Sequence, residues 1–303
     1  MGLSTPRQKA PPMIINKFTV PLFVAAALFL APLTANAADD SRTDAPVQRI
    51  TEMLYPSVMV DVGRGQGSGT IIYSGWRDDE EAWTMVLTNH HVVKSAIQIL
   101  SEFDPKRGEE IKREHRRPVK IRFWSYNDHS AAIGTSGRTA HIVGWDKHRD
   151  LALLRVEDKE QIYDNVAVMW PEDADGPYVF QKSWAVGSGL GNPPYPTEGL
   201  LSNTTAKDKE GYSLYQSSAP IIFGNSGGSL YVYSKLRDSY ELIGVPSMVS
   251  AVGFGSIVSF IAWSRPIDEI RSFIRQADFG WVIGDDPPEE DGDEEKDEDD
   301  SSE

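Results

Sequence analysis

A serine flanked by glycines is the feature of this chain with the clearest chemical meaning. Residues 224–228, GNSGG, place glycine on both sides of Ser226, so the backbone can turn sharply and expose the hydroxyl. Backbone amides in such a turn point into one space, where they can stabilise the oxyanion of an acyl-transfer intermediate. An ordinary turn between two strands uses the same residue types. The segment therefore indicates catalysis only if suitable partners for Ser226 exist elsewhere in the chain.

A histidine is the first partner that Ser226 requires, because a neutral imidazole must remove the proton of the hydroxyl. All six histidines precede Ser226, which excludes the nucleophile elbow of α/β-hydrolases, where the histidine follows the serine. His90 and His91 end an apolar segment that we interpret as a strand. Adjacent strand residues point to opposite faces and no third ligand lies nearby, so the pair fits a general base better than a metal site. We predict no metal.

An aspartate is the third group of this chemistry. Asp150 directly precedes the apolar segment 151–156, LALLRV, where a carboxylate can be buried enough to orient an imidazole and stabilise its charged form. Aspartates are also common in turns before strands, and we interpret Asp146 as such a turn residue. His91, Asp150 and Ser226 follow one another at separations of 59 and 76 positions. Taken together, the three segments indicate nucleophilic acyl transfer.

Short strands have to position these groups. Apolar segments bounded by turn residues form two sets, separated by a break near residues 157–176. Many short strands in two sets favour two antiparallel β-barrels over βαβ units. We predict strands over 57–62, 68–73, 83–88, 96–100, 119–124, 139–143 and 151–156, then over 183–186, 199–203, 213–217, 228–233, 241–246 and 256–262.

The segments outside these strands give two helices and two loops. A short helix is predicted over residues 44–54, with Asp44 as its cap, and a second over 264–277, with Ser264 as its cap. The segments 77–81 and 102–117 are highly charged, and we expect both to be solvent-exposed loops. The fold class is therefore all-β, with two six-stranded antiparallel barrels and short helices near both ends.

Composition excludes several function classes. The chain has 303 residues, no cysteine and a formal net charge of −15. Without cysteine there is no disulfide scaffold, no thiol nucleophile and no Cys-ligated metal. The negative charge argues against nucleic-acid binding, because phosphate recognition needs a basic surface. We expect no nucleic-acid partner and no cofactor.

The N-terminal segment has the three parts of a secretory signal. Basic residues precede the apolar run 18–33, and residues 35–37, ANA, form a cleavage site. We predict a signal peptide over residues 1–37, with translation starting at Met1 or Met13, and a periplasmic or secreted mature protein that does not span a membrane. The alternative is an uncleaved anchor, which the short, proline-containing run disfavours. The lack of cysteine favours the periplasm.

The C-terminal segment is strongly acidic. Residues 285–303 contain thirteen acidic side chains and one lysine, a charge of −12. Apart from two prolines this segment has no apolar side chain, so it cannot bury enough surface to fold. We predict a disordered acidic tail over residues 282–303.

The three chemical segments resemble the catalytic blocks of trypsin-like serine proteases of the chymotrypsin fold: 87–93, LTNHHVV; 150–156, DLALLRV; and 224–230, GNSGGSL. The likeness is greatest to the cysteine-free bacterial HtrA/Deg branch and covers about residues 58–274. It implies that His91 is the general base, Asp150 its orienting carboxylate and Ser226 the nucleophile. It further implies an oxyanion hole formed by the backbone amides of Gly224 and Ser226.

Three departures from the HtrA/Deg pattern affect assembly and control. That branch has a PDZ domain after the protease domain, and we expect none here. Phe223 stands where the branch usually has arginine, and the 102–117 insert is long.

The resemblance also implies where substrate specificity is set. The residue six positions before the nucleophile lies at the base of the substrate pocket; trypsins have aspartate there, and this chain has Pro220. The expected pocket wall, which includes Ser259 and Phe260, carries no charge either. Burying an unpaired lysine or arginine side chain there would be costly, whereas a small aliphatic side chain gains from burial. We therefore expect cleavage after small aliphatic residues.

These observations predict an exported serine endopeptidase that acts on unfolded or flexible proteins through an acyl-enzyme. The protease domain is predicted over 38–281, with barrels at about 55–157 and 177–263. Its partners are protein or peptide substrates, and the sequence does not determine the natural substrate or the oligomeric state. The alternative function is a catalytically weak protease-fold binding protein or chaperone, which holds unfolded chains or a partner protein without cutting them.

Overall fold

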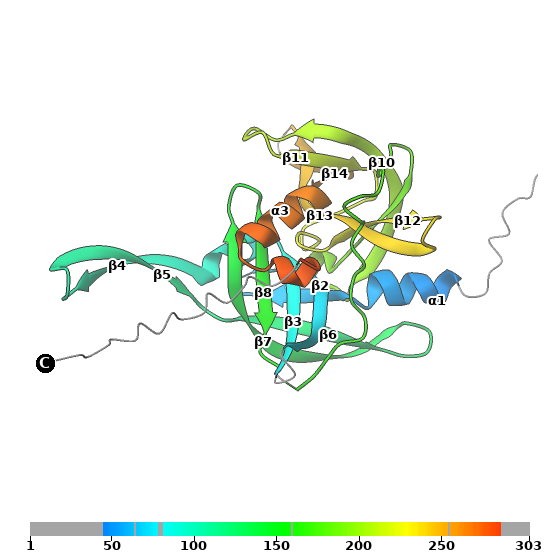
Figure 1. Ribbon diagram of the computed structural model, residues 1–303. Helices are drawn as coiled ribbons and strands as arrows, with labels where there is room; N and C mark the ends of the chain where they lie inside the picture. The colour runs from blue at the N-terminus through cyan, green and yellow to red at the C-terminus, as the bar shows by residue number, and fades with distance from the viewer. Residues whose placement is uncertain (1–44, 64, 78–80, 159, 254, 286–303) are drawn as a thin grey trace, which may run out of the picture. The chain divides into compact units, whose positions relative to one another are not determined.

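Two closed six-stranded barrels make up most of the fold (Figure 1). The computed structural model describes residues 45–63, 65–77, 81–158, 160–253 and 255–285. The predicted signal peptide and residues 286–303 of the predicted acidic tail lie outside the described residues. All pairings between the barrel strands are antiparallel, so the predicted fold class is confirmed.

The first barrel closes where β1 pairs with β6, and its strand order is β1-β2-β3-β8-β7-β6. Its strands are β1 (Ser57–Asp61), β2 (Gln66–Arg77), β3 (Glu81–Thr88), β6 (Val119–Tyr126), β7 (Ala132–Asp146) and β8 (Leu151–Val156). The second barrel has the order β10-β11-β14-β13-β12-β9. Its strands are β9 (Lys182–Gly187), β10 (Tyr195–Lys207), β11 (Ser213–Ser217), β12 (Ser229–Ser234), β13 (Ser239–Val252) and β14 (Ser256–Pro266).

The uninterrupted apolar run of β8 follows from burial of both of its faces. Successive side chains of a strand point to opposite sides. Ala152 and Leu154 belong to the core inside the first barrel. Leu151 and Leu153 belong to a second core, which the outside of the first barrel shares with the second barrel. The strand that follows Asp150 is therefore fixed from both sides.

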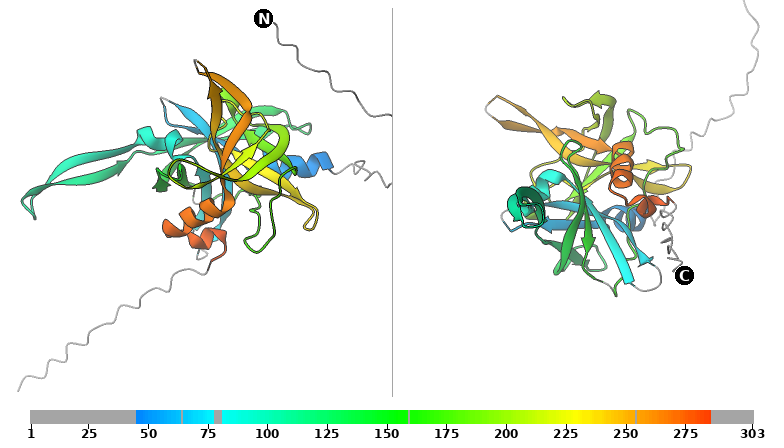
Figure 2. Two further views of the ribbon diagram at one scale, coloured as in Figure 1. Left: turned by 90° about the horizontal axis from the view of Figure 1, so that it is seen from above. Right: turned by 60° about the vertical axis from the view of Figure 1, so that its left-hand side comes forward.

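The charged insert is a β-hairpin and not the expected loop. β4 (Ile97–Asp104) and β5 (Glu109–Arg116) form a separate two-stranded sheet, which projects from the first barrel (Figures 1 and 2). The strand predicted over 96–100 is the first part of β4, whereas the prediction of a loop over 102–117 was wrong. The many charged residues of this segment had indicated a loop. In the hairpin, opposite charges pair across the two strands: the carboxylate of Glu102 lies 3.6 Å from Arg113 Nε.

Short helices lie near both ends of the described chain, as predicted. α1 (Ala45–Arg49) continues directly into the π-helical turn η1 (Ile50–Leu54). The predicted cap of this helix, Asp44, lies outside the described residues. α3 (Ile267–Gln276) packs against strands of both barrels.

The start of α3 and the end of the folded chain differ from the prediction. Ser264 was expected to cap the helix, but it pairs with Tyr215 inside the sheet, and the capping position is taken by Pro266. After α3 the 3₁₀ helix η4 (Gly280–Ile283) buries Val282. The folded chain therefore includes residues 282 and 283, which lie past the predicted boundary at residue 281.

No helix in the described segments combines the length and the apolar composition that crossing a membrane would need.

Candidate active site

His91 and Asp150 form the centre of the site. Nδ1 of His91 lies 2.7 Å from Oδ2 of Asp150, and the His91 backbone amide donates to Oδ1 at 2.9 Å. A carboxylate can only accept hydrogen bonds, so the proton of a neutral His91 ring belongs on Nδ1. Nε2 is then free to accept a proton, which is the state that a general base requires. The His91 side chain is 38% exposed, so the ring is partly open to solvent.

The two adjacent histidines are on a helix, so their predicted location at the end of a strand was wrong. Both belong to α2 (His90–Val93), a single turn that follows β3 and precedes the 3₁₀ turn η2 (Lys94–Ala96). The ring of His90 stacks on Trp145 at a centroid distance of 5.0 Å. Burial lowers the pKa of His90, against the opposing charge of Asp150. His90 is thus a neutral packing residue and does not take part in the hydrogen bonds to Asp150.

The backbone of Asp150 adopts an unusual conformation. Its φ is +55°, in the left-handed region that costs a non-glycine residue roughly 1–2 kcal/mol. The side-chain amide of Asn89 donates to the Asp150 carbonyl at 2.8 Å. This bond ties the conformation of Asp150 to the residue that precedes α2.

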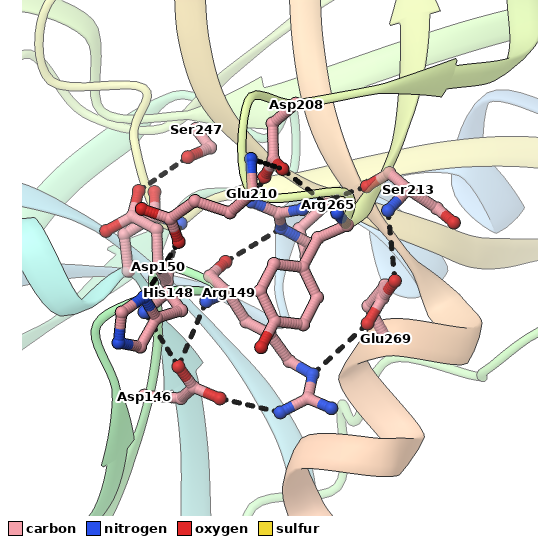
Figure 3. Close-up of polar contacts among 12 residues, drawn as sticks. Asp146, His148, Arg149, Asp150, Asp208, Glu210, Ser213, Ser247, Arg265 and Glu269 are labelled. Carbon is pink, nitrogen blue, oxygen red and sulfur yellow. Dashed lines mark hydrogen bonds and ion pairs between the residues drawn. The ribbon is translucent and has the colours of Figure 1, made fainter.

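A second hydroxyl, which the sequence did not identify, also contacts the carboxylate. Ser247 of β13 donates from Oγ to Oδ2 of Asp150 at 2.5 Å (Figure 3). Burial alone would raise the pKa of Asp150, but the hydrogen bonds from His91 and Ser247 outweigh it, so the pKa lies below its ordinary value. Asp150 is therefore ionised at neutral pH. A single serine within a largely apolar strand carries no signal that could have revealed this contact.

Ser226 lies in a turn that glycine makes possible. Gly224 and Gly227 have φ values of +98° and +83°. A Cβ on Gly224 would approach the Ser188 carbonyl to 2.6 Å, so a larger residue would disturb the turn. A Cβ on Gly227 would collide with the Thr88 hydroxyl and the Ser68 carbonyl. The turn is thus packed closely against the end of β3, just before α2.

The turn contains the two backbone amides that we expect to form an oxyanion hole, those of Gly224 and Ser226. The Phe223 carbonyl accepts a hydrogen bond from the Leu190 amide at 2.7 Å, which turns this oxygen toward the 3₁₀ turn η3 (Gly189–Gly191). Among the hydrogen bonds of the described residues, none uses the amide of Gly224 or of Ser226. Both donors are therefore available to a ligand oxygen.

No hydrogen bond joins Ser226 Oγ to His91 within the part of the chain that the structure describes. Such contacts are often long without substrate and shorten when it binds. The structure places the Ser226 turn beside the segment that leads into His91, and it joins His91 to Asp150 directly.

Ser68 is a second residue that sequence reasoning missed. It is fully buried in β2 and holds the turn that contains Ser226 at two points. Its amide donates to the Ser226 carbonyl at 2.8 Å, and its hydroxyl donates to the Gly224 carbonyl at 2.6 Å. The same hydroxyl accepts from the Ser188 amide at 2.7 Å. The first barrel thus fixes a turn that belongs to the second.

The residues expected to form the substrate pocket are only partly together. The Ser259 carbonyl accepts a hydrogen bond from the Ile221 amide at 3.0 Å, so β14 lies beside the residue after Pro220. The Pro220 carbonyl accepts from Thr197 Oγ1 at 2.8 Å. The side chain of Phe260 is 60% exposed, which places much of its ring in solvent.

Comparisons with known proteins agree with this geometry. The model of the trypsin-like peptidase domain matches residues 67–235. The chain is 28% identical over 143 residues to Protease Do-like 1, chloroplastic, from Arabidopsis thaliana; the match covers 45% of this chain and 30% of that protein. The chain therefore spans less than a third of the length of this relative.

Solved structures share the fold at low sequence identity. A structure of Deg5 matches with a TM-score of 0.51 and 20% identity, over 77% of this chain and 93% of that chain. An HtrA-type protease solved with a tripeptide matches with a TM-score of 0.51 and 18% identity, over 77% of this chain and 63% of that chain.

Proposed function

Since the chain belongs to the trypsin-like peptidase domain family, we propose that it is an exported serine endopeptidase acting on unfolded or flexible proteins. One observation carries the proposal: His91 is hydrogen-bonded to an ionised, partly buried carboxylate, beside a serine turn whose two backbone amides make no other hydrogen bond among the described residues. Each of these groups has a role in acyl transfer, whereas the stability of the fold does not require them to be combined in one place.

The reaction uses these groups in two halves. In the first, Ser226 Oγ attacks the carbonyl carbon of the scissile bond while Nε2 of His91 takes the hydroxyl proton. The amides of Gly224 and Ser226 stabilise the oxyanion that forms. The C–N bond then breaks, the amine leaves with the proton from His91, and the acyl group stays on Ser226. In the second half, water attacks the acyl-enzyme with His91 again as base, which releases the carboxylic acid and restores Ser226.

The surroundings of Asp150 support this role for His91. The imidazole becomes positively charged each time it accepts a proton, and an ionised carboxylate at 2.7 Å stabilises that charge. Because Ser247 also donates to Asp150, the carboxylate stays ionised and keeps one orientation.

Substrate preference is the finer part of the proposal. The residues at the proposed pocket base, Ala219, Pro220 and Ile221, carry no charge to pair with lysine or arginine. Desolvating such a side chain without a partner costs several kcal/mol, whereas a small aliphatic side chain gains about 1–3 kcal/mol from burial. Cleavage after alanine, valine or leucine follows.

The location of the enzyme rests on sequence patterns. The basic and apolar segments before residue 37 support export to the periplasm or the exterior, and the acidic residues after 285 support a charged tail on the peptidase domain.

A fluorophosphonate probe tests the central proposal. Such a probe reacts with a serine only where a base and an oxyanion hole activate it. We expect strong labelling of the wild type and none of Ser226→Ala. A folded wild-type protein that takes no label would contradict the enzyme and favour the alternative of a binding protein that does not cut.

Digestion of denatured casein tests the preference separately. New termini mapped by mass spectrometry should follow small aliphatic residues and be absent with Ser226→Ala. A majority of cuts after lysine or arginine would overturn the pocket assignment while leaving the serine mechanism intact.

A further inference from the structure

The strained conformation of Asp150 depends on the two peptide planes beside it. A peptide unit is planar, so the orientation of the Arg149 carbonyl and that of the Asp150 amide are linked. The plane after Asp150 is held by Asn89, which donates to the Asp150 carbonyl at 2.8 Å. The plane before Asp150 is held by Arg265, whose Nε donates to the Arg149 carbonyl at 2.8 Å. Together these two bonds restrain both dihedral angles of Asp150.

Arg265 is itself fixed deep in the second barrel. Only 2% of this β14 residue is exposed. Besides the Arg149 carbonyl, it donates to the Ser213 carbonyl at 3.0 Å and to Oδ2 of Asp208 at 2.9 Å (Figure 3). A buried guanidinium is costly unless it is paired and fully hydrogen-bonded, and here the carboxylate of Asp208 supplies the charge. Arg265 is therefore held at three points and cannot rearrange freely.

The side chain of Arg149 is held independently. Its guanidinium lies 2.6 Å from Asp146 and 3.1 Å from Glu269 of α3. The second oxygen of Glu269 accepts from the Ser213 amide at 3.0 Å. Ser213 is thus bonded through its amide to Glu269 and through its carbonyl to Arg265. Arg149 is connected to β11 by two routes, one to its side chain and one to its backbone.

From this arrangement we infer that Arg265 is a positioning residue for Asp150. The inference rests on the proposed function, because it assigns Arg265 a task in the same His91–Asp150 pair. Arg265 contacts neither His91 nor Ser226; it acts by fixing the peptide plane from which the Asp150 side chain projects. The guanidinium suits this task because its rigid planar fork spreads the N–H donors over three nitrogens, which here reach two carbonyls and a carboxylate in different directions. An apolar side chain could fill the same volume but would leave the Arg149 carbonyl without its donor.

The test compares Arg265→Leu with a control that also removes an arginine from a carboxylate of the second barrel. The control is Arg237→Leu. Arg237 Nε lies 2.5 Å from the carboxylate of the fully buried Glu241, and the variant loses this contact. The contact belongs to the same barrel but does not involve residue 149. Two readouts are measured below the melting transitions: kcat and KM on a peptide substrate, and the far-downfield proton NMR signal of the His91 Nδ1–H···Asp150 hydrogen bond.

For Arg265→Leu we expect kcat to fall by about 100-fold with KM nearly unchanged, because a small misplacement of a catalytic group has effects of that size. The NMR signal should shift or broaden. Arg265→Lys, which can reach fewer acceptors, should give intermediate values. Arg237→Leu should lower the melting temperature and leave both kcat and the NMR signal as in the wild type.

Equal kcat and an unchanged signal in Arg265→Leu would overturn the inference, as would equal losses in the Arg237→Leu control. If Arg265→Leu does not fold, the same measurements are made on Arg265→Lys and Asp208→Asn. The inference is overturned if kcat and the NMR signal are as in the wild type in each of these two variants. The NMR signal needs no substrate, so the inference is tested even if the wild type takes no fluorophosphonate label, which contradicts only the proposed function.

Discussion

The hydroxyl of Ser247 lies 2.5 Å from Oδ2 of Asp150, the same oxygen that lies 2.7 Å from Nδ1 of His91. One residue of the second barrel thus donates to the carboxylate that orients a histidine of the first. The set of hydrogen bonds to the Asp150 carboxylate is consequently complete only when the two barrels are in contact.

Ser247→Ala should reduce kcat/KM by roughly 10- to 100-fold, since a hydrogen bond to a charged group contributes about 1.5–3 kcal/mol. Steady-state kinetics on one peptide substrate measure the effect. Ser250→Ala is the matched control, because Ser250 lies in the same strand and accepts a hydrogen bond from Trp263 at 3.0 Å, away from Asp150. Equal activity in the two variants would remove Ser247 from the site.

The two adjacent histidines should respond very differently to replacement. His91→Ala should lower kcat by roughly 10⁴- to 10⁶-fold, because triad members act as a unit. His90→Ala loses only the stack on Trp145, worth about 1 kcal/mol of stability, and should keep most activity. Kinetics and thermal melts of both variants give the answer, and comparable kinetic losses in two folded proteins would reverse the assignment.

Asp208 should make stability depend on pH. Burial raises its pKa, but the hydrogen bonds from Arg265 and the Tyr212 amide outweigh this, so its pKa in the folded protein lies below the ordinary value. A carboxyl group with a lowered folded-state pKa stabilises the protein above its unfolded pKa of about 3.9, and this contribution is lost as the pH falls through the folded value. The melting temperature of the wild type should therefore exceed that of Asp208→Asn most at neutral pH, with a gap that closes below about pH 4. A gap of the same size at pH 3 and pH 7 would contradict this.

Two truncations should separate the acidic tail from the folded chain. Residues 286–303 carry twelve acidic side chains and one lysine, and we expect their removal to leave the melting temperature unchanged. Truncation after residue 281 also removes Val282, which is buried, and Asp285, which pairs with Arg275 at 2.8 Å. Loss of the valine alone should cost about 2 kcal/mol and lower the melting temperature by several degrees. Equal melting temperatures of the two truncated proteins would show that η4 contributes nothing.

The barrels could be predicted because each strand is marked by the apolar residues of its own short segment. Runs such as LALLRV in β8 are apolar because both faces are buried, and this pattern can be read within six residues. The β4–β5 hairpin could not be predicted in the same way, because neither of its strands has a buried residue and its apolar side chains therefore follow no strand pattern. The location of His91 on a helix was missed because α2 is a single turn, too short for a periodic pattern.

The supporting residues of the site were missed for a different reason. Ser68, Ser247 and Arg265 act through partners 156, 97 and 116 positions away in the chain. The sequence around a single polar residue in a strand does not indicate which distant residue it contacts. Only the three segments that match a known catalytic arrangement could be assigned from the sequence.

The contacts of Ser68 bear on the stage of folding at which Ser226 can become reactive. Its amide and hydroxyl hold the carbonyls of Ser226 and Gly224, so the nucleophile turn takes its shape only against a finished first barrel. If the chain is the proposed protease, we therefore expect Ser226 to be unreactive until the first barrel has formed. During refolding, reaction with a fluorophosphonate should begin only in the last kinetic phase; labelling in an earlier phase would show that the turn forms without Ser68.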